Sequence, residues 1–208
     1  MAPFRQFAAP TVRCIALRLA GAGMLCLALP SQAWVLTITA GPRAVYLAVG
    51  NATANANNAT VNLVTVNVPA TALGNNVAQP MTSNSTQATS PFDGFTVCQP
   101  TLGQVYIGGY LRQPNGSVGN AVLQVSTPAN LVSAADTIPF SQISWTSTAL
   151  GNATADIPAG SFTGTVQFLR NIATNTYVEN CHTFNYANAA VRAAGTYRGR
   201  ATYTLIAP

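Results

Sequence analysis

Few side chains in this sequence could carry out chemistry. After residue 33 the titratable candidates are Asp93, Asp136, Asp156, Glu179 and His182. None of the four carboxylates stands in a strand-end setting that would pair it with a second acid, as glycosidases require. The aspartates lie among turn-forming residues, where a carboxylate commonly bonds to nearby backbone. The pattern therefore favours structural turn roles.

His182 follows Cys181 and lies close to Glu179, which raises the question of a metal site or a nucleophile. A zinc site needs three or four protein ligands, and a cysteine nucleophile needs a free thiolate. In an alternating strand His182 lies on the face opposite Glu179 and Cys181, so we expect it at the surface or rim. The sequence predicts no enzyme, no metal site and no cofactor.

The first 33 residues have the pattern of a secretory signal peptide. Arg5, Arg13 and Arg18 precede the apolar run "LAGAGMLCLALP", and "SQA" ends at Ala33. The run is about 12 residues long, whereas a membrane span needs roughly 20. We therefore expect cleavage before Trp34 and an exported chain of residues 34–208, in the periplasm, on the cell surface or outside the cell, without a transmembrane segment.

Removal of this leader changes the cysteine count and the charge. Cys98 and Cys181 remain and should form one disulfide in an oxidising compartment, the alternative being two free thiols. The leader carries three of the nine arginines, so six face four acids and the net charge falls from +5 to +2. No basic cluster remains that could neutralise many phosphates, which excludes nucleic-acid binding.

The composition favours an all-β protein. Hydrophobic residues make up 49% of the chain and charged residues only 6%, while Thr and Asn occupy the polar positions. Threonine suits exposed strand faces and asparagine suits turns. About 175 residues form one domain, 34–208. Ten strands are expected, at residues 34–40, 44–50, 60–70, 95–100, 104–112, 121–127, 140–148, 164–170, 176–187 and 197–208, with a hairpin tip at 51–60 and an exposed crossover at 75–91.

Aromatic residues allow two interpretations. Trp145, Tyr106 and Tyr110 are first expected in the core of a β-sandwich. The alternative is that Tyr110 and Trp145 form a platform on which a sugar ring stacks.

The C-terminal sequence "AGTYRGRATYTLIAP" places Gly195 fourteenth from the end, followed by Tyr197, Tyr203 and Leu205 at alternating positions. With "IPAGSFTGTVQF" upstream, it resembles the subunits of chaperone-usher pili and their spore-coat-U-like relatives. The chain departs from them at Ala207, where tyrosine is common, and in the wide separation of its cysteines. The resemblance implies an Ig-like (pilin-like) antiparallel β-sandwich whose partners are other pilus-type subunits and a periplasmic chaperone.

In that family a neighbour's extended segment completes the subunit by strand addition. The candidate donor segment carries alternating apolar residues at Leu36, Ile38, Val45, Leu47 and Val49, and the alternative is that these residues form the protein's own first strands. The first functional hypothesis is an exported, non-enzymatic structural or adhesive surface protein resembling a fimbrial subunit. The second is a self-contained secreted β-sandwich that binds carbohydrate or another surface ligand.

Overall fold

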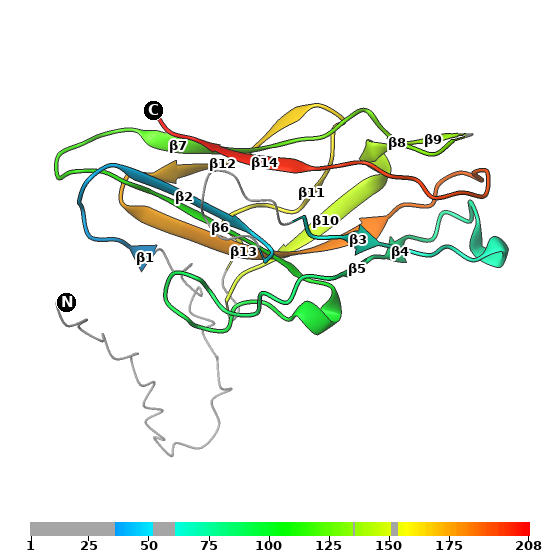
Figure 1. Ribbon diagram of the computed structural model, residues 1–208, viewed down its shortest axis with the longest axis horizontal. Helices are drawn as coiled ribbons and strands as arrows, with labels where there is room; N and C mark the ends of the chain where they lie inside the picture. Colours follow the sequence, from blue (N-terminus) through cyan, green and yellow to red (C-terminus); the bar gives the residue numbers. More distant parts are fainter. Residues whose placement is uncertain (1–35, 52–60, 135, 151–153) are drawn as a thin grey trace, which may run out of the picture. The chain divides into compact units, whose positions relative to one another are not determined.

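The computed structural model describes residues 36–51, 61–134, 136–150 and 154–208. These residues form antiparallel β-sheets, with three short 3-10 turns at Ala70–Ala72, Pro100–Leu102 and Phe140–Gln142 (Figure 1). The all-β prediction is confirmed. The predicted signal peptide and nearly all of the predicted hairpin tip at 51–60 lie outside the described residues.

The larger sheet is built around its longest strand, β13 (Thr176–Tyr186). Its main path runs β11 (Gly160–Ser161), β10 (Ile143–Thr148), β13, β6 (Val105–Arg112) and β2 (Ala44–Val49). Two short strands, β1 (Leu36–Thr37) and β4 (Gln79–Pro80), also pair with β13. Strand β2 therefore ends the sheet on one side.

The second sheet has the order β12 (Val166–Ala173), β7 (Asn120–Ser126) and β14 (Thr202–Ile206). The pairing of β12 with β7 shifts register between Phe168 and Arg170, which marks a β-bulge. Two further ladders join β3 (Val64–Thr65) to β5 (Thr82–Ser83), and β8 (Asn130–Val132) to β9 (Thr137–Pro139).

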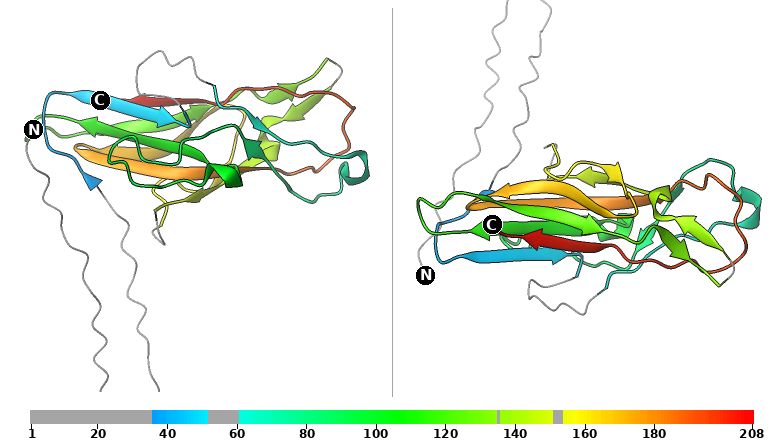
Figure 2. Two further views of the ribbon diagram at one scale, coloured as in Figure 1. Left: turned by 60° about the horizontal axis from the view of Figure 1, so that its bottom comes forward. Right: turned by 90° about the horizontal axis from the view of Figure 1, so that it is seen from above.

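One hydrophobic core lies between the two sheets, which Figures 1 and 2 show packed against each other. Its residues follow the two-residue period of a strand. Strand β6 contributes Val105, Ile107 and Leu111, and strand β7 contributes Leu123 and Val125. The alternation visible in the sequence thus selects the face of each strand that is buried.

Gly109 lets the two sheets approach closely. A Cβ atom there would lie only 2.7 Å from the carbonyl oxygen of Tyr46. It would also lie 3.4 Å from Leu205 Cδ2 and 3.7 Å from Ile172 Cδ1, both from the second sheet. A side chain at Gly109 would therefore displace the β2 backbone and crowd the residues that cover β6.

The predicted disulfide between Cys98 and Cys181 is present, with a Cα to Cα distance of 5.6 Å. It joins β13 to residues 84–103, on the face of the larger sheet that points away from the core. Ala48 and Tyr106 pack against it. The bond therefore fastens a long irregular segment to the outer face of the sheet.

Several predicted strands were wrong in extent. Residues 95–100 form no strand and make one isolated bridge, Thr89 with Thr96. In the predicted strand at 60–70 only β3 pairs, and the expected exposed crossover at 75–91 contains β4, β5 and the buried Met81. Strands of two or three residues are too short to produce a periodic signal, which explains these errors.

His182 also differs from expectation, because it is fully buried in the core rather than at the surface. The sequence correctly placed His182 on the same face of β13 as Val178 and Phe184, but that face points into the core. The His182 ring stacks on Trp145 with a centroid separation of 5.8 Å. Neither ring nitrogen has a hydrogen-bond partner among the described residues.

Candidate functional site

The described residues contain no group of three or more His, Cys, Asp or Glu side chains that could hold a metal ion. In the same part of the chain, no helix is long and apolar enough to cross a membrane. The feature best suited to function is instead a pair of strand edges that have no ladder partner within the described ranges.

Strand β14 provides the first edge. In the described structure it pairs only with β7, residue for residue from Thr202 opposite Ser126 to Ile206 opposite Val122. Tyr203 and Leu205 are half-buried against the core, and the residues between them face solvent. The backbone donors and acceptors on the other side of β14 have no ladder partner within the described residues.

The predicted C-terminal strand begins later than expected, at Thr202 instead of Tyr197. Arg198 makes an isolated backbone bridge to Val132 in β8. The Tyr197 hydroxyl donates to Asp136 Oδ2 at 3.1 Å, next to the β8–β9 hairpin. These contacts hold Tyr197 and the exposed Gly195 in a loop, so the alternation of half-buried and exposed residues in β14 begins only after them.

Strand β2 provides the second edge. Among the described residues it pairs only with β6, while Leu47 and Val49 are half-buried against the core. Figures 1 and 2 show β2 and β14 running beside one another, and the Arg43 guanidinium donates to the carbonyl of Pro208 at one end. We call this line between β2 and β14 the seam.

The apolar row of β2 continues beyond the seam in residues 61–68. Val64, Val66 and Val68 are half-buried against the core, and the residues that alternate with them are exposed. Only β3 within this segment is paired, with β5. Half-buried apolar side chains thus occur at alternate positions both in β2 and in residues 61–68.

The seam has the two properties that an added strand requires. Unpaired N–H and C=O groups offer main-chain hydrogen bonds. Half-buried apolar residues at alternate positions offer contacts to a second row of apolar side chains. Burial also raises the pKa of the Tyr203 phenol, so this side chain stays uncharged even in alkaline solution. The seam can therefore accept an extended segment with apolar residues at every second position.

The candidate donor residues lie within the chain's own larger sheet. Leu36 is opposite Tyr177 in the β1–β13 pair, and Ile38 is buried. Val45, Leu47 and Val49 belong to β2, opposite β6. In this structure the segment occupies the internal position that the sequence offered as the alternative.

The candidate ligand platform is not formed. Trp145 is a core residue, only 4% exposed, and its indole N–H donates to the Pro158 carbonyl at 2.9 Å. Tyr110 lies on the opposite, outer face of the larger sheet, stacked on Tyr46 with ring centroids 5.2 Å apart. The two rings cannot contact one ligand, because the sheet separates them.

Sequence reasoning missed the aromatic cluster to which Tyr110 belongs. Phe92 stacks on Tyr177 at 4.6 Å and meets the edge of Tyr110 at 6.0 Å. The Tyr106 hydroxyl contacts that of Tyr177 and lies 2.8 Å from Glu179 Oε2. Burial, and then neighbouring charge, raises the pKa of both the Tyr106 and Tyr177 phenols, so they stay protonated. Only alternation on β6 and β13 could have indicated that these rings share a face.

Searches with this chain found no matching protein-family model, no similar curated protein and no similar solved structure.

Proposed function

We propose that this protein is an exported, non-enzymatic structural or adhesive surface subunit with an Ig-like, pilin-like β-sandwich, and that it assembles by strand addition at the seam. The observation that carries the proposal is the pair of edges at β2 and β14 that are unpaired in the described part of the chain, each with half-buried apolar side chains. The occupant is an extended segment of another subunit.

The physical basis is that an added strand can pair with one free edge and cover the apolar side chains along the seam. Each main-chain hydrogen bond contributes about 1 kcal/mol net. Each apolar side chain that becomes fully buried contributes up to about 1.5–3 kcal/mol. A segment that makes several of both would offset the entropy lost when two chains associate.

Other features of the chain support the proposal. The C-terminal residues from Gly195 onward resemble those of chaperone-usher subunits, and the leader pattern with the Cys98–Cys181 disulfide fits an oxidising compartment. The unpaired edge explains why a chaperone would be needed, since exposed strand edges otherwise aggregate.

A matched pair of variants tests the proposal. Leu205→Arg places a charge in the seam, whereas Thr204→Arg places the same charge on the exposed face of the same strand. We expect Leu205→Arg to abolish assembly, measured by light scattering after size-exclusion chromatography, and Thr204→Arg to assemble as the wild type does.

Circular dichroism melting of each variant distinguishes lost assembly from lost folding. If Leu205→Arg unfolds, the milder Leu205→Ser replaces it in the same comparison. A wild-type protein that stays monomeric at high concentration, with or without a chaperone, would contradict the proposal. So would equal assembly of a folded Leu205 variant and Thr204→Arg.

A further inference from the structure

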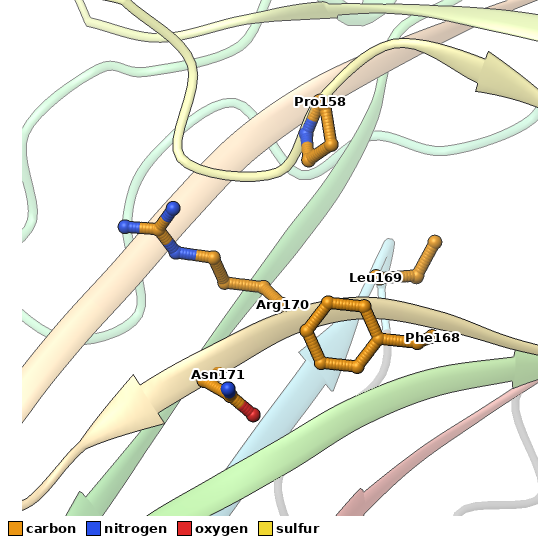
Figure 3. Close-up of a pocket in the computed structure, with 5 residues that line it drawn as sticks. All are labelled: Pro158, Phe168, Leu169, Arg170 and Asn171. Atoms are coloured by element: carbon orange, nitrogen blue, oxygen red, sulfur yellow. The ribbon is translucent and has the colours of Figure 1, made fainter.

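A hollow lies at the outer edge of β12, where residue Pro158 faces the strand (Figure 3). It is lined by Pro158, Phe168, Leu169, Arg170 and Asn171 and has a volume of about 450 Å³. Sites for small molecules span about 300–1,000 Å³, so the space suits one or two sugar rings. In the second sheet β7 separates β12 from β14, so the hollow is distinct from the seam.

The β-bulge creates the lining of this hollow. Phe168 is opposite Gln124 and Arg170 is opposite Leu123, so β12 contains one extra residue at this point. As a result Arg170 and its neighbour Asn171 are both exposed, where strict alternation would expose only one. Bulges commonly re-aim side chains beside binding sites. Here the bulge gathers a phenyl ring, a guanidinium and an amide on one edge.

These side chains offer complementary contacts. Phe168 is 59% exposed, and among the described residues its ring stacks on no other aromatic ring, so one face is open to a ligand. Arg170 pairs with Asp156 at 3.4 Å through one nitrogen, which leaves other guanidinium N–H groups available. Burial raises the pKa of Asp156 and the Arg170 charge opposes this rise.

We propose that this hollow is a binding site for a neutral sugar ring. The C–H groups on one face of the sugar would stack on Phe168, as aromatic faces favour. Hydroxyl groups would bond to the Arg170 guanidinium and the Asn171 amide, which together present both donors and an acceptor. A neutral ligand fits because Asp156 already balances the charge of Arg170.

This inference assigns a class of ligand to the adhesive role proposed above, and it does not depend on strand addition. Its test uses a reporter built into the site. Because the Trp145 indole N–H bonds to the Pro158 carbonyl, its NMR signal should shift when a ligand contacts Pro158. Trp145→Phe identifies that signal. The probes are the methyl glycosides of mannose, galactose and glucose, each added to about 50 mM because single sugars bind weakly.

We expect at least one glycoside to shift the Trp145 signal with millimolar affinity, and Phe168→Ala to weaken binding about tenfold. Val166→Ala is the control, because Val166 is equally exposed on the same strand but does not line the hollow. Arg170→Gln should also weaken binding. The inference is overturned if no glycoside binds, if Phe168→Ala binds as Val166→Ala does, or if only an anionic sugar such as N-acetylneuraminic acid binds.

Discussion

The buried His182 makes the stability of this protein depend on pH. It is the chain's single histidine, and burial lowers its pKa from 6.5 to about 3. The folded state therefore resists protonation, while the unfolded chain takes up a proton near pH 6.5. The stability linked to this group is fully present above pH 6.5 and is lost progressively as the pH falls toward 3.

The expected loss follows from the two pKa values. Each pH unit between them corresponds to about 1.4 kcal/mol. At pH 5 the free energy of unfolding should be lower than at pH 7 by about 2 kcal/mol, and at pH 3 by about 4 kcal/mol from this residue alone. Carboxyl groups titrate mainly below pH 5, so the interval from pH 7 to pH 5 isolates the histidine.

Urea unfolding at pH 7 and pH 5, followed by circular dichroism, measures this difference. His182→Phe is the control, because a phenyl ring can keep the stacking with Trp145 but cannot be protonated. The variant should lose far less stability than the wild type over the same interval. Equal free energies of unfolding for the wild type at the two pH values would refute the reasoning. Equal losses in the wild type and the variant would refute it too.

Three further predictions concern the fold. Gly109→Ala should lower the free energy of unfolding by about 1–3 kcal/mol through overpacking, whereas Gly195→Ala, whose Cβ would meet only ordinary contacts at 3.5 Å, should be nearly neutral; equal effects in urea unfolding would contradict the packing of Gly109. Replacing Cys98 and Cys181 by serine should cost up to about 4.5 kcal/mol, given the sequence separation of 83, and unchanged stability would contradict a structural disulfide. Deletion of residues 203–208 removes most of β14 and should abolish folding, so a soluble, cystine-bonded truncation product would contradict the need for that strand.

The sequence predicted those parts of the fold in which alternation is long. In β7 the apolar residues Ala121, Leu123 and Val125 recur at every second position, so both the strand and its buried face could be identified. In β13 the strand could be identified, but its buried face carries the polar Asn180 and His182 and was therefore expected at the surface. The disulfide could be predicted because Cys14 and Cys26 fall in the predicted leader, which leaves Cys98 and Cys181 as the expected pair. Both predictions rest on residue types and their order along the chain, and neither needs knowledge of the topology.

The candidate sites depended on topology and were harder to predict. Whether β2 and β14 have partners on both sides is decided by strand order, which no residue pattern in this chain reports. Trp145 and Tyr110 each fit the two-residue period of their own strand, yet they lie on opposite faces of one sheet. The bulge at Leu169 breaks the two-residue period, so the exposure of Arg170 beside Asn171 could not be read from alternation.

Hydrogen–deuterium exchange of β14 tests strand addition most directly. In the monomer, those amides of residues 202–206 that point away from β7 should exchange rapidly, because they have no ladder partner among the residues that the structure describes. On assembly these amides, or those on the free edge of β2, should become protected. Assembly that leaves exchange in β14 and β2 unchanged, and protects another surface instead, would contradict strand addition at the seam.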